Sequence, residues 1–173
     1  PYGDWSSDVC SSDLRAILDI FSVLGDVDLN NEEKAVGTLG IFYKDFCSMP
    51  SEHMGEALKK CFWFINCGND ETPKKPLKLM DWEQDFQHLI APINRIAGRE
   101  VRADQYLHWW SFISYYVEIG DCFFAQIVRI RSLKAKGKLK SKQDKEFYRN
   151  NKDAIDLKMH YSAAEEEIIK GWT

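Results

Sequence analysis

The sequence lacks most of the features that mark enzymes, metal proteins and membrane proteins. No stretch approaches the roughly 20 uninterrupted apolar residues that a membrane-spanning helix needs, because charges interrupt every window. None of the five cysteines forms a CxxC pair, so neither a zinc spacing nor a redox motif is present. The sequence also has no GxSxG nucleophile motif and no glycine-rich phosphate loop. We therefore expect a non-enzymatic protein without a cofactor, a metal or a membrane segment.

Strand-like alternation is nearly absent too, and helical spacing of apolar residues dominates. Hydrophobic residues make up 45% of the 173 residues and aromatic residues 13%, which is ample for a packed core. The length fits one domain. The sequence thus predicts an all-α fold, a single irregular helical domain of about six to eight helices that a proline- and lysine-containing loop could divide into two helical subunits.

The first 14 residues stand apart from this pattern. Asp4–Leu14 reads DWSSDVCSSDL, has no apolar periodicity, and matches one reading frame of a common sequencing adapter. A native disordered arm is the alternative. We interpret residues 1–14 as adapter-derived, expect the native N-terminus to be missing, and exclude the segment from fold reasoning. Without its three aspartates the chain has 24 acidic and 23 basic residues, so the net charge moves from −4 to −1. This charge does not favour nucleic acid, a membrane or an acidic protein as the partner.

An N-terminal helical part is expected over residues 15–67. Apolar residues at helical spacing predict a first helix that ends near Gly25. Asn30 and Glu33 form a predicted capping box, in which each side chain bonds to the other residue's backbone amide at the start of the second helix. A third helix is expected to begin at Pro50.

A linker loop is predicted over residues 68–78 (GNDETPKKPLK), which contain two prolines, one glycine and no apolar pattern. It separates the N-terminal part from a C-terminal helical part over residues 79–157. Residues 158–173 are expected to form a charged C-terminal tail or helix.

Local end signals divide the C-terminal part into helices. Asp81 and Gln84 form a second capping pair, and Gly98 is a natural C-terminal stop for the helix that follows them. Pro92 inside that helix is expected to kink it, because proline lacks the backbone amide. Asp121 is the predicted cap of a later helix.

The most aromatic helix is expected from about Asp104 to Ile119. At 100° per residue its apolar residues make two adjoining stripes, which predicts packing on two sides and a buried, non-catalytic role. His108 lies at the border of this apolar arc. The stripes contain Tyr106, Trp110, Ile113 and Val117 in one and Trp109, Phe112, Tyr116 and Ile119 in the other. The predicted core framework consists of Tyr106, Trp109, Trp110, Phe112, Ile113, Phe86 and Ile127.

Asp81, Asp85 and His88 share one helical face, at positions i, i+4 and i+7. Two carboxylates and an imidazole could bind a divalent metal or perform acid–base chemistry. Acidic residues in the first turns of a helix also complement its dipole and cap its amides. No second cluster supplies further ligands, so we interpret these residues as a helix start and predict no metal site.

A strongly basic segment covers residues 131–152, with nine basic and two acidic residues. We predict that it contacts a partner protein. Nucleic-acid binding, with Phe147 and Tyr148 stacking on bases, and a plain solvated surface are the alternatives. An acidic C-terminal stretch, 165–167, could also neutralise it. The candidate partner-binding residues are Arg131, Lys134, Lys138, Lys140, Lys142 and Arg149.

Four motifs in residues 77–155 resemble those of the bacteriophage gene-product-fifteen family, small proteins encoded among the tail genes of long-tailed phages. An acidic-aromatic start is followed by a Leu-His-Trp-Trp-x-Phe motif, an Ile-x-x-x-Arg segment and a Lys-Glu-Phe-Tyr-Arg segment. The N-terminus and the residues after Leu157 have no counterpart in this pattern. The matching segments are residues 81–85, 107–112, 127–131 and 145–149.

The resemblance implies a role in tail assembly. We expect a helical, chaperone-like factor that keeps the long tape-measure protein soluble in the host cytoplasm until the tail polymerises. A minor structural component of the virion tail is one alternative, and a nucleic-acid-binding module using residues 131–152 is another. The resemblance carries over no catalytic or metal-binding residue, and it leaves the oligomeric state open.

Overall fold

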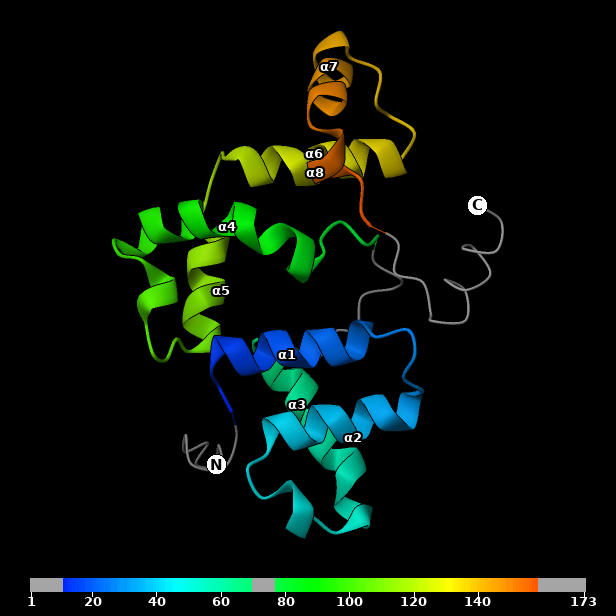
Figure 1. Cartoon of the computed structure of the whole chain (residues 1–173), viewed down its shortest axis with the longest axis vertical. Coiled ribbons are helices and arrows are strands. Elements are labelled where there is room, and N and C mark those ends of the chain that lie inside the picture. Colours follow the sequence, from blue (N-terminus) through cyan, green and yellow to red (C-terminus); the bar gives the residue numbers. More distant parts are fainter. Residues whose placement is uncertain (1–10, 70–76, 159–173) are drawn as a thin grey trace. The chain divides into compact units, whose positions relative to one another are not determined.

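The computed structural model describes residues 11–69 and 77–158 (Figure 1). In these ranges the chain forms eight α-helices, three short 3₁₀ helices and no extended strand, which confirms the all-α class. None of the helices in this part of the chain is long and apolar enough to cross a membrane. Most of the predicted linker and nearly all of the predicted tail lie outside the described residues. The 3₁₀ helices are Phe46–Ser48, Ser51–His53 and Val101–Ala103.

The chain divides into two compact units. Among the described residues, unit 1 contains 11–69 and 106–110, and unit 2 contains 77–105 and 111–158. The segment Tyr106–Trp110, which lies in the predicted C-terminal part, therefore clusters with the N-terminal helices.

Unit 1 is built on α1 (Leu14–Gly25), α2 (Asn31–Phe42) and α3 (Met54–Ile65). Helices α1 and α2 run side by side, and α3 packs across α2 (Figure 1). The Asn30 side chain accepts the Glu33 amide and the Glu33 carboxylate accepts the Asn30 amide, which confirms the predicted capping box. The buried core includes Ile17, Ile20, Leu39, Phe42, Cys61 and Phe64.

Residues 11–14 are part of the packing of unit 1. The Trp109 amide donates to the Ser12 carbonyl, and the Leu14 amide donates to the Leu107 carbonyl, both at 2.8 Å. The sequence did not predict this main-chain pairing of residues 11–14 with residues 107–109. Both bonds join main-chain groups, which a native segment of different sequence would also carry. The adapter origin of the segment stays a prediction.

Unit 2 contains α4 (Trp82–Ala97), α6 (Phe123–Ala135), α7 (Lys142–Asn150) and α8 (Lys152–Ile155), together with most of α5 (Trp109–Val117). Helix α6 packs against α4 on one side and α8 on another (Figure 1). The core of this unit includes Leu89, Ile90, Ile93, Phe112, Phe124, Ile127, Ile130 and Ile155.

The ends of α4 agree only in part with those predicted from the sequence. Gly98 ends the helix in the left-handed conformation, with φ of 68°, as predicted. Asp81 Oδ1 accepts the Gln84 amide at 3.1 Å, but the Gln84 side chain does not return to Asp81. Its amide instead donates to the Asp156 carbonyl at 2.9 Å, and Asp85 accepts the Asp81 amide. The predicted capping pair is therefore only half formed, because the Gln84 side chain bonds to Asp156 and Asp85 takes its place as the acceptor of the Asp81 amide.

Helix α5 begins at Trp109, later than the predicted start at Asp104. The Leu107 carbonyl and the Trp109 amide pair with residues 11–14, so this stretch cannot also close a helical turn. His108 Nδ1 accepts the Trp110 amide at 3.1 Å and satisfies one of the free amides at the helix start. Tyr106 therefore precedes the helix.

Helix α6 also begins differently from the prediction. Its cap is Cys122, whose sulfur accepts the Ala125 amide at 3.4 Å, and the predicted cap Asp121 does not occupy that position. The helix starts one residue later than an Asp121 cap would give.

Candidate partner-binding surface

The two tryptophans of the motif lie at the end of α3. Trp109 Nε1 donates to the Ile65 carbonyl and Trp110 Nε1 donates to the Phe64 carbonyl, both at 2.8 Å. The last carbonyls of a helix have no partner within it, so these two bonds satisfy groups that the helix leaves open, and the Phe64 carbonyl also accepts the Cys67 amide at 3.0 Å. Trp110 also stacks on Phe64, with 5.3 Å between ring centroids. The motif therefore holds the C-terminal end of α3.

The predicted core framework is buried only in part. Trp109, Phe112 and Ile127 are buried, and Phe86 and Ile113 are partly buried. Tyr106 and Trp110 are 53% and 36% exposed, so the prediction that they are core residues is wrong. Tyr106 precedes the helix, and in the stripe predicted from it Trp110 and Val117 are exposed whereas Ile113 is partly buried.

A buried ion pair joins α4 and α6. Arg131 forms two bonds with the Asp85 carboxylate, Nη1–Oδ2 at 2.6 Å and Nη2–Oδ1 at 2.9 Å. Its remaining N–H groups donate to the carbonyls of Leu79, Ala154 and Ile155 at 2.7 to 3.0 Å. The side chains are 4% and 0% exposed. All five guanidinium N–H groups thus have an acceptor, which offsets the cost of burying the charges.

This pair corrects one predicted partner contact. Arg131 is 5% exposed, so it is not available to a partner protein. A signal for its burial was present in the sequence, because Phe124, Ile127 and Arg131 share one helical stripe at positions i, i+3 and i+7. The basic composition of the surrounding segment concealed it.

The acidic helix start does not form a metal site in the described residues. Asp81 caps α4 and pairs with Lys78 at 2.9 Å, while Asp85 pairs with Arg131. The His88 ring packs edge-on against Phe123, with 5.4 Å between centroids. The helix-start interpretation therefore holds for Asp81 and in part for Asp85, whose carboxylate accepts the Asp81 amide but is also buried against Arg131.

Lys134 is exposed but paired. Its Nζ lies 2.6 Å from the Asp156 carboxylate and 3.0 Å from the Tyr148 hydroxyl, which in turn donates to Asp156 at 2.9 Å. Partial burial raises the pKa of Asp156, but the hydrogen bonds from Lys134 and Tyr148 outweigh it and leave the pKa below its ordinary value. The bond to Asp156 raises the pKa of Lys134. This predicted contact residue is thus occupied within unit 2.

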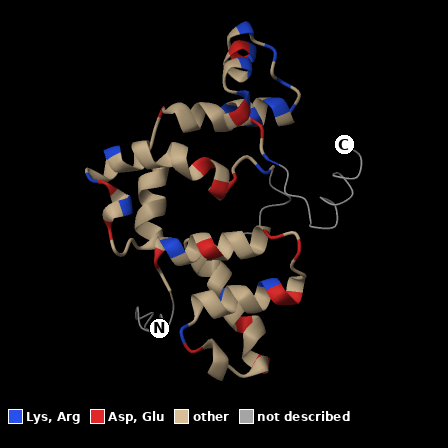
Figure 2. Cartoon of the chain, in the orientation of Figure 1, with Lys and Arg blue, Asp and Glu red and all other residues tan. Residues whose placement is uncertain are grey.

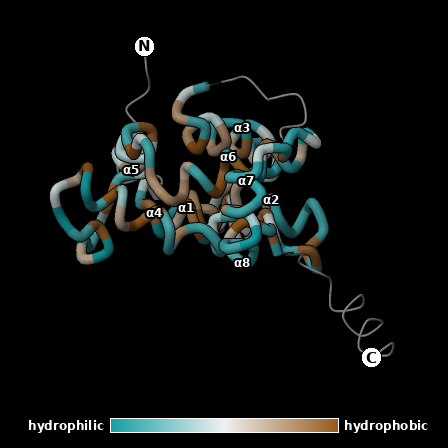
Figure 3. The backbone as a smooth tube through the Cα atoms, turned by 90° about the horizontal axis from the view of Figure 1, so that it is seen from above, coloured by the Kyte–Doolittle hydropathy of each residue, from teal (hydrophilic) through white to brown (hydrophobic). Residues whose placement is uncertain are grey.

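Six further bases form what we call the basic face. They lie on the α6–α7 connection and on α7, where Figure 2 shows Lys and Arg gathered and Figure 3 shows α7 mainly in the hydrophilic colour. All six are exposed, and none forms an ion pair with a described residue. The basic face consists of Lys136, Lys138, Lys140, Lys142, Lys145 and Arg149. Four of the predicted contact residues therefore remain accessible, and their contact with a partner stays a prediction.

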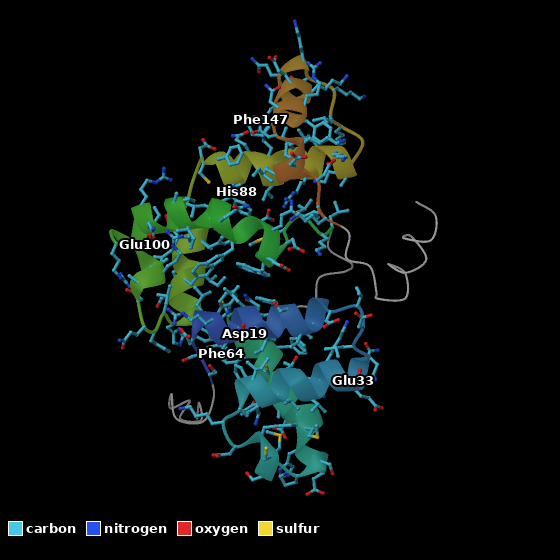
Figure 4. The ribbon with its side chains drawn as sticks, viewed as in Figure 1. Asp19, Glu33, Phe64, His88, Glu100 and Phe147 are labelled. Carbon is cyan, nitrogen blue, oxygen red and sulfur yellow. The ribbon has the colours of Figure 1, made fainter. Side chains whose placement is uncertain are left out.

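Apolar and ionic contacts fix the basic face on unit 2. Phe147 lies at the base of α7, towards α6, and packs with Leu139 against the buried cluster of Ile127, Ile130 and Ile155 (Figure 4). Asp144 pairs with Arg129 of α6 at 2.6 Å. The two aromatic rings that could have stacked on bases, Phe147 and Tyr148, are thus both engaged inside the unit.

Comparison with known proteins supports the resemblance noted in the sequence. The chain has no significant match among curated proteins or among solved structures. The family profile described as "Bacteriophage Gp15 protein" matches residues 9–157. Because this match covers well over half of the chain, the protein belongs to the bacteriophage Gp15 protein family.

Proposed function

We propose that this phage protein is a tail-assembly factor that acts by protein–protein contact and performs no catalysis. Its expected partner is the tape-measure protein, which it would keep soluble in the host cytoplasm until tail subunits polymerise. The observation that carries the proposal is the basic face, six accessible cations on a helical unit whose neighbouring aromatic rings are engaged inside.

The same observation disfavours nucleic acid as the partner. Proteins that bind single strands combine a cationic groove with aromatic rings on which bases stack. Here Phe147 packs in the apolar cluster and the Tyr148 hydroxyl is bonded to Asp156. The basic face offers charge without stacking surfaces, which suits carboxylates of a protein partner better than nucleobases.

Co-expression with the tape-measure protein of the same phage tests the proposal. We expect the tagged chain to raise the soluble fraction of the tape-measure protein and to co-purify with it. A long helical tape-measure gene just downstream in the phage genome would add support. If the tape-measure protein is equally insoluble with and without the chain, and does not co-purify, the proposal is wrong.

A further inference from the structure

The bases of α7 occupy one side of the helix. At 3.6 residues per turn, Lys142, Lys145 and Arg149 fall within an arc of about 60°. Phe147 lies on the opposite side and packs against the apolar cluster, and Tyr148, about 90° from the centre of this arc, is bonded to Asp156. Because those contacts fix the rotation of α7, the three bases form an outward stripe, and all three are exposed.

The stripe has a defined length. Seven residues at 1.5 Å rise place its ends about 10 Å apart along the helix. Carboxylates at positions i, i+3 or i+4, and i+7 of another helix are separated by the same rise and share one face. An acidic helix of this spacing can therefore place one carboxylate near each base.

The loop before α7 extends the positive charge beyond the stripe. Leu139 is partly buried against the apolar cluster, whereas its neighbours Lys138 and Lys140 are exposed. Their charges would attract an acidic segment toward α7 before contact, an effect that weakens as salt increases.

We propose that the Lys142–Lys145–Arg149 stripe docks an acidic α-helix of the partner protein. This inference rests on the proposed function, since it names the chemistry of the partner segment. Glu146 is exposed next to the stripe and would repel a phosphate backbone, whereas a partner helix can place a base opposite it.

Two synthetic helical peptides of identical composition test the stripe geometry on the full chain. One carries its glutamates on a single face, and the other distributes them around the helix. We expect the aligned peptide to bind about tenfold more tightly by fluorescence anisotropy at low salt. Equal affinity for the two peptides would show that only net charge matters and would overturn the proposal.

A matched pair of variants tests which bases are responsible. The stripe variant is Lys142→Gln, Lys145→Gln, Arg149→Gln; glutamine keeps a good helix propensity. The control, Lys44→Gln, Lys59→Gln, Lys158→Gln, removes the same charge at exposed positions elsewhere. The stripe variant should lose the preference for the aligned peptide, and the control should keep it within about twofold. Far-UV circular dichroism checks that each variant is folded. If the triple variant does not fold, the single variants Lys145→Gln and Arg149→Gln are used in its place.

A short DNA duplex serves as the competing ligand. If the duplex binds more tightly than the aligned peptide, and this binding depends on the stripe, the proposal is overturned in favour of nucleic acid.

Failure of the docking proposal can be distinguished from failure of the proposed function. If the stripe variant still co-purifies with the tape-measure protein, the docking proposal fails and the function stands. If the aligned peptide binds through the stripe but no tape-measure protein co-purifies, the docking chemistry stands and the function fails.

Discussion

Trp109 and Trp110 use the same hydrogen bond in different surroundings. Each indole donates to a carbonyl at the end of α3, but Trp109 is 2% exposed and Trp110 is 36% exposed. A buried carbonyl left without a donor keeps the full cost of its desolvation, whereas the Phe64 carbonyl also accepts the Cys67 amide and keeps that donor when the Trp110 indole is lost. The two residues should therefore differ in their contribution to stability.

The prediction for this pair concerns the indole N–H alone. Trp109→Phe should lower the free energy of unfolding by about 1–3 kcal/mol, and Trp110→Phe by less than about 1 kcal/mol. Truncation to alanine widens the difference, since Trp109→Ala should cost about 3–5 kcal/mol. Urea denaturation followed by far-UV circular dichroism measures both. A Trp110→Phe variant as destabilised as Trp109→Phe would contradict this ranking.

The buried pair of Asp85 and Arg131 leads to a second prediction. Arg131→Met leaves an uncompensated buried carboxylate and should cost about 3–5 kcal/mol, and Asp85→Leu should have a similar cost. The double variant should be less destabilised than the sum of the single variants, because neither charge is then left unpaired. It should remain below the wild type, since Arg131 also donates to three carbonyls. A double-mutant cycle in urea measures the coupling, and additive effects would show that the pair does not act as a unit.

Individual side chains show what the sequence could and could not predict. Asn30 and Gly98 were predicted correctly because capping boxes and left-handed helix ends depend on a few neighbouring residues. The role of Arg131 was missed because its partner, Asp85, is 46 residues away in the chain. Helical spacing places Arg131 on the stripe of Phe124 and Ile127, but its pairing with Asp85 requires the packing of α4 on α6.

At the scale of helices, α5 shows the limit of periodicity. Its spacing of aromatic residues continues back to Tyr106, yet the helix starts at Trp109 because main-chain groups of Leu107 and Trp109 pair with residues 11–14. A tertiary contact therefore overrides a local pattern. The burial of the Trp109 and Phe112 stripe was nevertheless predicted correctly, because that part of the pattern lies inside the helix.

The start of α5 should respond to pH. Partial burial lowers the pKa of His108 below the ordinary histidine value of about 6.5, and its Nδ1 can accept the Trp110 amide only while unprotonated. Since the folded pKa lies below the unfolded one, the unfolded chain binds more protons in this window. His108 should therefore contribute stability above about pH 6.5 that is lost as the pH falls towards the folded pKa.

Melting temperatures between about pH 7.5 and pH 5.5 measure this effect. The wild type should lose melting temperature on acidification, and His108→Asn should lose less, because asparagine is a good helix cap that does not titrate here. His53→Asn, at an exposed position, is the control and should keep the wild-type pH dependence. An unchanged pH dependence in His108→Asn would exclude His108 as its source.

At the scale of the whole molecule, the fold class and family followed from the sequence, but the boundaries of the units did not. Apolar spacing and four motifs were sufficient to predict an all-α member of this phage family. Grouping of residues 106–110 with the N-terminal helices depends on bonds to Ile65, Phe64 and the 11–14 segment, which no local pattern encodes. The basic face was predicted as a segment, and the structure narrows it to six exposed bases on the α6–α7 connection and α7.

The last prediction separates an assembly factor from a minor structural component of the tail. A factor that releases the tape-measure protein as the tail polymerises should be present in infected-cell lysates and absent from purified virions. Docking through exposed charges suits such release, because surface ion pairs are individually weak and sensitive to salt. Quantitative mass spectrometry of purified virions measures the ratio of this chain to the tape-measure protein. A fixed ratio near that of a tail subunit would identify a structural component and would contradict the assembly role.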